Sequence, residues 1–594
     1  MILAVAITAA FLVAAVLLPR ISEGCFGFVE RRFEALSRQM VLGRAALFFG
    51  VIVVRVALLP LLPVPAPGIH DEFSYLLMAD TFARGRLANP PHPMWMSFET
   101  FHVNWFPTYS SMYPPAQGAV LALGQLLGTP WLGVLLSAAA MCAAIYWMLC
   151  VWMPSRWAFL AGILVALKLG LTSYWMNSYW GGAIAAIGGA LVLGALDRLF
   201  KRARPGDALT LGAGIAILAN SRPYEGLVFC LPAVFLFLQW LWRKRKNREN
   251  GKIPWARVIA PLSAVLLFTM AFMGYYNWRL TGNALLFPHT LNERAYESVP
   301  PFFWQTPLPE KHYNNDRFEE FFNVWEREEY TRSWNSFVNV SLTKTIRFSS
   351  AFCWPGLAFL LPGLPFALRD QKLRVLWVTL GCVLVAVYLV VWSNAHYAAP
   401  ATCLFFALVV QSLRHVRTIR SSRFAWGKAL SRAAVTLLVV NTAAAAARKE
   451  CDPIDWTCKS DESRTLVLRK LQGEPGKHLV MVRYNEDDLS VHDEWVFNGA
   501  DIDGSKIIWA RELDRAQNKR LFEYFKDRKI WLATTEDGHL VFGPYQAPES
   551  QYSSCGRNWF ATSSKSVPLN TASREAARSP CPAAASFSSA TSDT

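Results

Sequence analysis

Two adjacent carboxylic acids and an imidazole, His70-Asp71-Glu72, follow an apolar run at residues 45–62 that is long enough to cross a bilayer. Ionisable side chains at the end of a membrane span are costly to keep there and are candidates for function. A carboxylate in such a place could act as a general base toward a hydroxyl group. An ordinary solvated loop is the alternative. The aromatic and apolar residues 73–80 favour instead a helix lying along the membrane face.

Composition places this pair of acids in a membrane protein. The chain has 594 residues, of which 53% are hydrophobic, and it contains 24 Trp and 38 Phe. A soluble multidomain protein of this length would be less apolar. The net charge of +16 could suggest a nucleic-acid partner, but the Lys and Arg residues stand in short clusters between apolar runs. The positive-inside rule explains that pattern, so we expect no nucleic-acid binding.

The basic clusters also predict the topology. We expect a mainly α-helical, polytopic membrane protein with about twelve transmembrane helices. Residues 1–18 are interpreted as a retained span, because they lack a positive leading region and a small-residue cleavage site. Placing every basic cluster on one side puts the loops 64–130 and 279–349 and the C-terminal region on the other. The spans are predicted near 1–18, 45–63, 131–152, 157–172, 181–199, 208–220, 226–242, 256–278, 350–368, 374–392, 397–413 and 431–447.

After residue 447 the composition becomes mixed, and a small extracytoplasmic α/β domain is predicted over 448–552. Strand-like runs and one helical run support it. From 553 to 594 the chain is rich in Ser, Ala, Thr and Pro and is predicted to be disordered. The predicted strands are 478–484, 506–510 and 529–533, and the predicted helix is 514–525.

Two further features of this C-terminal region leave alternatives open. Cys451 and Cys458 flank a short polar stretch just outside the last span, where an oxidising compartment would permit a disulfide. They could equally be unpaired. The acidic cluster between Asp487 and Glu494 could hold a metal ion, although acidic loops are more often simply solvated.

The first outer loop carries more polar side chains after the paired acids. His92, Glu99 and His102 occur within twelve residues of each other, and Tyr113-Pro-Pro leads into an apolar helix. An Asp-Glu pair early in a long outer loop, a helix after it, and a Tyr-Pro-Pro start to the next membrane helix together resemble the GT-C superfamily. That superfamily comprises polyprenyl-phosphate-sugar-dependent glycosyltransferases, including the protein O-mannosyltransferases and the lipid A aminoarabinose transferases.

Other stretches agree with this resemblance, which covers roughly residues 40–447. Asn220-Ser-Arg222-Pro-Tyr-Glu-Gly places an Arg at an outer helix end, and Arg279 opens the second large outer loop. The stretch from Asn394 to Pro400 is similar to an Arg-Tyr-x-x-Pro motif of such enzymes, with His396 in place of Arg and Tyr397 retained. That departure leaves open which cation binds the donor phosphate.

The resemblance implies Asp71 as the general base, with Glu72 raising its pKa as a like charge or orienting the acceptor. The residues implied in binding the donor phosphate or the acceptor are Arg222, His396, Tyr397, Arg279, His102, Glu99 and Tyr113. Among the cations Arg222 ranks first, because arginine suits bidentate phosphate contact.

Each of these side chains also has a purely structural interpretation. Arg222 could extend to the membrane interface, and Arg279 beside Trp278 could anchor that interface. His396 could be a hydrogen-bonded residue at a helix end. Tyr113 could be an interfacial aromatic residue instead of a platform for a sugar.

We therefore expect an integral glycosyltransferase of a bacterial inner membrane. It would move a sugar from a polyprenyl-phosphate donor to a lipid, glycan or protein acceptor on the extracytoplasmic side, with inversion from a single displacement. A lipid or glycolipid transporter, or a non-catalytic envelope assembly protein, are the alternatives. No cofactor is expected to be required. A divalent cation such as Mg²⁺ or Mn²⁺ remains open, with Asp71, Glu72, Glu99, His92 and His102 as oxygen and nitrogen ligands.

Overall fold

The computed structural model describes the chain with gaps, and within the described residues eight helices are long and apolar enough to cross a membrane. The protein is therefore a multi-pass membrane protein. The spans are α3 (Met40–Ala57), α7 (Pro130–Leu149), α9 (Ala183–Arg202), α11 (Pro223–Lys246), η1 with α12 (Trp255–Thr281), η5 with α18 (Gln371–Leu389), η6 with α19 (Ala395–Arg417) and α20 (Trp426–Ala447). The described residues are Ala10, Val13, 19–246, 254–330, 334–353, 360–392, 394–419, 426–449, 462–485, 494–536 and 539–546.

Each of these eight helices overlaps one of the predicted spans. Two further predicted spans are the shorter helices α8 (Ser155–Leu169) and α10 (Pro205–Ala219). Near 350–368 the structure has the end of α16 (Trp334–Cys353), then η4 (Leu361–Gly363) and α17 (Leu364–Leu368). The predicted span 1–18 lies outside the described residues apart from Ala10 and Val13.

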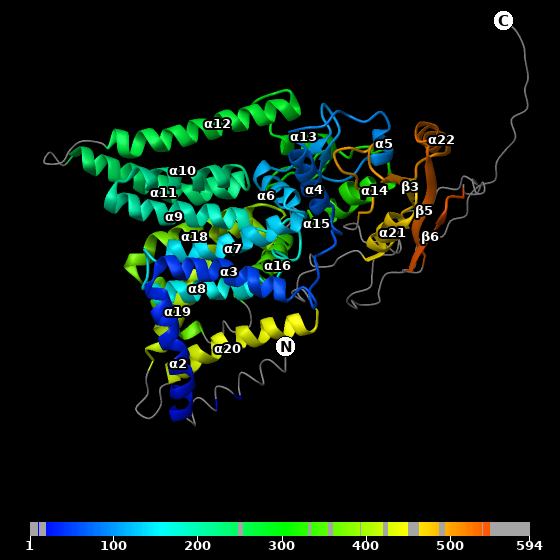
Figure 1. Cartoon of the computed structure of the whole chain (residues 1–594). Helices are drawn as coiled ribbons and strands as arrows, with labels where there is room; N and C mark the ends of the chain where they lie inside the picture. Colours follow the sequence, from blue (N-terminus) through cyan, green and yellow to red (C-terminus); the bar gives the residue numbers. More distant parts are fainter. Residues whose placement is uncertain are drawn as a thin grey trace, which may run out of the picture. The chain divides into compact units, whose positions relative to one another are not determined.

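The helices differ in how far they are buried. On α12, Leu267, Phe268 and Met270 are 65%, 74% and 68% exposed, as expected of side chains that face lipid. The helix α10 packs between α9 and α12, and α19 contacts both α8 and α20 (Figure 1). Nearly all residues of η6 and α19 are buried, so this segment lies in the middle of the bundle.

On the predicted cytoplasmic side, a helix that the sequence did not predict precedes the first span. It is α2 (Pro19–Arg38), and its Glu30 accepts hydrogen bonds from Arg417 at 2.8 Å and from Arg432 at 3.1 Å. These contacts join α2 to α19 and α20.

The first outer loop is built around α4 (His70–Ala83), which packs on α6 (Pro115–Leu126). A Cβ atom at Gly118 would lie 2.2 Å from the Met78 sulfur, so only glycine allows this close approach. Between the two helices run α5 (Trp95–Phe98), β1 (Val103–Asn104) and β2 (Ser110–Ser111). Helix α4 is buried on most sides and does not lie along a membrane face, because Phe73 stacks on Phe497 of the C-terminal region.

Between Pro288 and Glu329 the second outer loop contains only short helical segments, and from Trp334 onward it is the first part of α16. An aromatic cluster of Phe318, Phe321 and Phe322 buries Phe101 of the first loop. The two outer loops therefore share one small core. The segments are α13 (Pro288–Tyr296), α14 (Asp316–Phe318), η2 (Glu319–Trp325) and α15 (Glu326–Glu329).

The C-terminal region forms the predicted α/β structure. Strand β3 (Lys477–Val482) pairs in parallel with β4 (Ile507–Arg511) and β5 (Arg528–Glu536), and α22 (Arg515–Tyr524) connects the last two. The sequence did not predict α21 (Glu462–Gly473) or β6 (His539–Pro544), which pairs antiparallel with β5. Cys451, Cys458 and the predicted disordered tail 553–594 lie outside the described residues.

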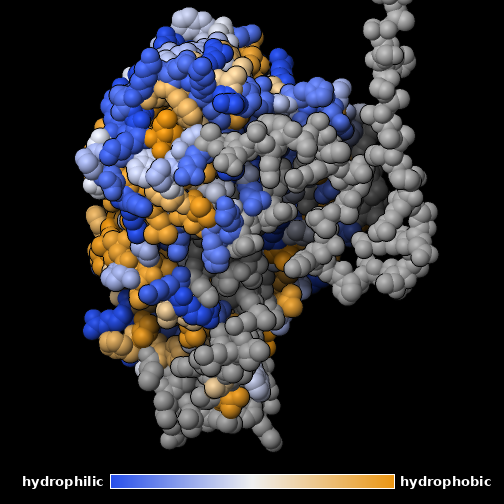
Figure 2. Space-filling view, turned by 90° about the vertical axis from the view of Figure 1, so that its right-hand side faces the viewer, coloured by the Kyte–Doolittle hydropathy of each residue, from blue (hydrophilic) through white to orange (hydrophobic). Residues whose placement is uncertain are grey.

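This sheet packs directly on the first outer loop. Leu479, Met481 and Ile508 share a buried cluster with Leu77 and Phe98. In the view toward this end of the molecule, hydrophilic side chains gather in the upper part of the described surface (Figure 2). The sheet therefore packs against α4, the helix that carries Asp71 and Glu72.

Candidate functional site around Asp71

The first turn of α4 carries Asp71 at a place where a helix N-terminus favours negative charge. Its carboxylate accepts a hydrogen bond from the Tyr113 hydroxyl. His70 Nδ1 lies 3.2 Å and His102 Nε2 lies 4.0 Å from Asp71 Oδ2. Burial alone would raise the pKa of Asp71, but His102, His70 and Tyr113 outweigh it and hold that pKa well below its usual range. These three neighbours therefore favour the carboxylate form of Asp71.

An aromatic and cationic group adjoins this carboxylate. The ring of Tyr75 stacks on Tyr113 with centroids 4.4 Å apart, and the Arg222 guanidinium lies 4.3 Å from the centroid of Tyr397. Electrostatic interactions join Tyr75 to both Asp71 and Arg222. The structure thus brings together five of the predicted site residues, namely Asp71, His102, Tyr113, Arg222 and Tyr397.

Glu72 has a different task from its neighbour. Its carboxylate accepts three backbone N–H groups, from Gly68 at 3.0 Å, Ile69 at 3.2 Å and Tyr179 at 3.0 Å. Burial raises the pKa of Glu72 to about 7, although these three donors oppose the rise. With an exposed fraction of 3% and its oxygens engaged, Glu72 fastens α4 to the turn at 171–182.

The turn that Glu72 binds is held from other sides as well. Arg55, fully buried in α3, donates to Asn177 Oδ1 at 2.9 Å and to the Leu62 carbonyl at 2.8 Å. Gln117 of α6 donates to the Tyr179 carbonyl at 2.9 Å. A buried arginine is tolerated only with such partners. The turn therefore acts as a rigid base for the first outer loop.

His396 belongs to η6, packs against this turn and is 2% exposed. Its Nδ1 atom is 2.9 Å from the Tyr174 hydroxyl, and its backbone N–H donates to that hydroxyl at 3.0 Å. The centroid of the Trp180 ring lies 4.7 Å from that of the His396 imidazole. His396 is an electrostatic neighbour of Arg222 and Asp71, but its contacts are those of a buried packing residue.

Two other predicted residues lie away from this group. Arg279 is exposed at the end of α12 with its guanidinium 5.9 Å from the Trp278 ring, which fits an interfacial anchor. Glu99 is 2% exposed and accepts hydrogen bonds from Tyr296 at 2.9 Å and from Asn314 at 3.2 Å. It joins the two outer loops.

His102 has an unusual backbone conformation, with φ of 59°. A residue other than glycine is held there only when its surroundings determine it, at a cost of order 1 kcal/mol. Its carbonyl accepts the Ser74 hydroxyl at 2.7 Å and the Met112 N–H at 3.1 Å. Its ring lies 4.5 Å from that of His70. The loop thus places both imidazoles beside one oxygen of Asp71.

Sequence reasoning missed two partners of the site. Tyr75, one turn after Asp71, was not among the predicted site residues. Glu225, three residues after Arg222 at the start of α11, is 6% exposed and interacts electrostatically with it. The spacing of three residues on one helix would have indicated that pair.

A pocket of about 310 Å³, including its open mouth, adjoins the Arg222 end of the site. Its lining is mostly apolar, with Asn220 and His289 as polar members. The lining residues are Met112, Pro114, Pro115, Ala219, Asn220, Pro223, Met273, Tyr276, Asn277, Phe287, Pro288 and His289.

One group in the described part of the chain has the spacing of metal ligands. Ligand atoms of His70, Asp71 and His102 lie within 4.8 Å of one another. Two imidazoles and one carboxylate suit zinc or a similar transition metal better than Mg²⁺, which prefers oxygen ligands. Glu72, Glu99 and His92 have other partners, the last pairing with Asp503 at 3.0 Å. The donor set therefore does not fit a magnesium site.

The comparisons with known proteins give a likeness of fold only. No family model matches the sequence, and a search of curated proteins finds no match. Among solved structures, ArnT from Cupriavidus metallidurans bound to undecaprenyl phosphate is similar at 12% identity and a TM-score of 0.46, over 83% of this chain and 93% of that chain.

The Archaeoglobus fulgidus oligosaccharyltransferase tethered with an acceptor peptide is similar at 10% identity and a TM-score of 0.42, over 82% of this chain and 69% of that one. Its apo form is similar at 11% identity and a TM-score of 0.37, over 75% of this chain and 62% of that one. Similarity at this level assigns no activity, so the function has to be argued from the residues of the site.

The pKa of Glu72 leads to a first prediction. Because the folded protein keeps the Glu72 proton up to about pH 7, its contribution to stability is complete below about pH 4.5 and is lost as the pH rises to 7. Wild type should therefore gain thermal stability relative to Glu72→Gln as the pH is lowered through this window. Melting of the purified protein in detergent measures it, with Glu34→Gln, a partly exposed site on α2, as the control. If the melting temperatures of wild type and Glu72→Gln changed with pH in the same way, the raised pKa of Glu72 would be contradicted.

Proposed function

We propose that this protein is a membrane glycosyltransferase that moves a sugar from a polyprenyl-phosphate donor to an acceptor hydroxyl group on the extracytoplasmic side of a bacterial inner membrane. One observation carries the proposal. The carboxylate of Asp71 accepts a hydrogen bond from Tyr113, which stacks on Tyr75, and the arginine Arg222 interacts electrostatically with that same Tyr75. A phosphate-linked sugar needs an anion to accept a proton on one side and a cation to hold the phosphate on the other. The resemblance of the sequence to the GT-C superfamily supports it.

Asp71 is the proposed general base. The acceptor hydroxyl group would donate a hydrogen bond to its carboxylate, and its oxygen would attack the anomeric carbon of the sugar. A carboxylate with a depressed pKa is a weak base toward a free hydroxyl group, so the proton moves late, once the new C–O bond has made that hydroxyl acidic. The imidazoles of His70 and His102 lie beside Oδ2 of the Asp71 carboxylate that accepts this proton.

Arg222 is the proposed partner of the leaving group. As the bond from the anomeric carbon to the phosphate oxygen breaks, the polyprenyl phosphate leaves with the electron pair, and a guanidinium stabilises the growing charge. The contact of Arg222 with the Tyr397 ring and its charge partner Glu225 would keep the guanidinium in one orientation. A single displacement of this kind inverts the anomeric carbon.

The decisive experiment is transfer from a radiolabelled pool of polyprenyl-phosphate sugars by the purified protein. Asp71→Asn should lower transfer by about 10²- to 10⁴-fold, because the amide cannot accept the proton. The control is Asp197→Asn, which makes the same chemical change at a residue that pairs with Lys201 near the C-terminal end of α9. This variant should leave transfer unchanged. If the folded Asp71→Asn protein transferred sugar at the wild-type rate, Asp71 would not be the general base.

A matched pair of arginines tests the phosphate site. Arg222→Gln should weaken binding of undecaprenyl phosphate on the order of 10- to 100-fold, as expected when a charged hydrogen bond is lost. Arg279→Gln removes an exposed arginine that contacts Trp278 and should not change this binding. Binding to the protein in lipid nanodiscs measures both variants. Equal effects of the two would show a general attraction of anionic lipid to the surface.

Because the donor set does not fit magnesium, we propose that transfer requires no Mg²⁺. Treatment of the enzyme with EDTA should leave the rate unchanged. Loss of transfer with EDTA that Mn²⁺ or Zn²⁺ restores would instead place a cation on His70, Asp71 and His102.

The same preparation separates the other two functions. A transporter would move the labelled lipid across the membrane of a vesicle without transfer to an acceptor. An assembly protein would neither move the labelled lipid nor transfer the sugar, and Asp71→Asn would not change its function.

A further inference from the structure

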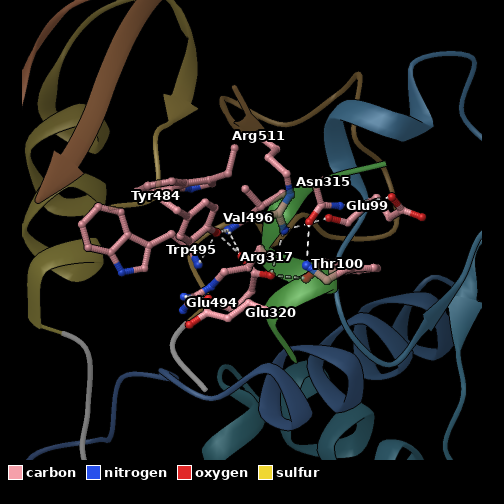
Figure 3. Close-up of polar contacts among 12 residues, drawn as sticks. Glu99, Thr100, Asn315, Arg317, Glu320, Tyr484, Glu494, Trp495, Val496 and Arg511 are labelled. Atoms are coloured by element: carbon pink, nitrogen blue, oxygen red, sulfur yellow. Dashed lines mark hydrogen bonds and ion pairs between the residues drawn. The ribbon is translucent and has the colours of Figure 1, made fainter. Parts of the chain in front are cut away.

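A buried ion pair in the C-terminal region contacts the segment that carries His102. Glu494 of the loop after β3 and Arg511 at the end of β4 lie 3.1 Å apart, with side chains 0% and 3% exposed (Figure 3). The sequence placed Glu494 in an acidic loop expected to be solvated, and that prediction is wrong for this residue. Two charges so deeply buried are costly unless hydrogen bonds satisfy them.

Both charged groups reach residues 99 and 100 of the first outer loop. Arg511 Nη2 donates to the Glu99 carbonyl at 3.1 Å, and the Thr100 hydroxyl donates to Glu494 Oε2 at 3.1 Å. The remaining Glu494 oxygen accepts the Val496 N–H at 2.9 Å and the Tyr484 hydroxyl. The pair therefore holds the loop backbone from the side of the C-terminal sheet (Figure 3).

The second outer loop contacts Glu99 and Phe101 of the same segment. Asn315 donates to the Glu99 carboxylate at 3.3 Å, and Phe101 is buried against Phe318 and Phe321. The next residue, His102, is the one with positive φ. A strained backbone beside a reacting carboxylate needs neighbours that determine it, and residues 99–101 are those neighbours.

We propose that Glu494 and Arg511 are positioning residues that act through His102. They fix residues 99 and 100, so that the imidazole of His102 is kept beside Asp71 Oδ2. This gives the C-terminal domain a part in the reaction, and it rests on the proposed transferase function. The domain would contribute geometry and no reacting group.

The test replaces the pair by apolar residues of similar volume, Glu494→Leu with Arg511→Met. Removing one charge would leave the other buried and unpaired, whereas replacing both is often neutral for stability. The turnover number should fall roughly 10- to 100-fold, as for small misplacements of a catalytic group, with the KM for the donor unchanged. The control is Arg483→Gln with Glu512→Gln, which removes a more exposed ion pair of the same domain and should leave turnover unchanged.

Coupling to His102 distinguishes positioning from general support of the fold. In a His102→Ala background, replacing Glu494 and Arg511 should have almost no further effect, because the route by which they act is gone. The same fold-loss in both backgrounds would overturn the proposal, as would full turnover of the pair variant. Thr100→Val, which removes one contact to Glu494, is the milder variant if the pair replacement does not fold. A turnover equal to wild type in Thr100→Val would then overturn it.

Hydrogen exchange tests the same contact without any activity. Peptides covering residues 99–112 should exchange faster in the pair variant than in wild type, and at the wild-type rate in the Arg483 and Glu512 control. Unchanged exchange in the pair variant would overturn the positioning. If wild type transfers no sugar from any donor, the proposed function fails, and this measurement still decides whether the pair positions the loop.

Discussion

The three hydrogen bonds from backbone N–H groups to the Glu72 carboxylate are the constraint on which the outer part of this protein depends. Two of them cap the start of α4, and the third reaches Tyr179, more than a hundred residues away. A helix whose first turn is fixed in this way has only one orientation about its axis. Asp71, adjacent in sequence, is then directed away from the turn and toward Tyr113 and the two histidines.

The same logic explains why several charges can be buried close to the membrane. Arg55 is compensated by carbonyl and amide oxygens, and Glu494 by Arg511, each with an exposed fraction close to zero. A buried charge without such partners would cost several kcal/mol. These groups therefore mark the places where the chain must adopt one arrangement, at the turn that Glu72 binds and at residues 99 and 100. The site is rigid because its surroundings cannot rearrange cheaply.

This division of labour shows what a sequence can reveal. Eight of the twelve predicted membrane spans, the strands β3, β4 and β5 and the helix after Asp514 follow local patterns of apolar residues, and those predictions were confirmed. The position of Arg222 near Asp71 could be expected because both were predicted on the same side of the membrane. Which of two adjacent acids contacts Tyr113 and the two histidines could not be predicted, because that depends on the bond from Tyr179 to Glu72. Arg279 illustrates the converse, since it was predicted on that same side but does not lie at the site.

The contacts that complete the site join residues very far apart in the chain. Asp80 accepts the Ala500 N–H at 2.7 Å, and His92 meets Asp503, each across more than 400 residues. Contacts of such sequence separation form only after the segments that carry them have folded. The first outer loop, although it leaves the membrane early in the chain, therefore reaches its final conformation only when the C-terminal sheet is in place. That order gives a reason for the C-terminal domain to remain attached to the membrane domain, because residues 99 and 100, just before His102, contact both the second outer loop and the C-terminal region.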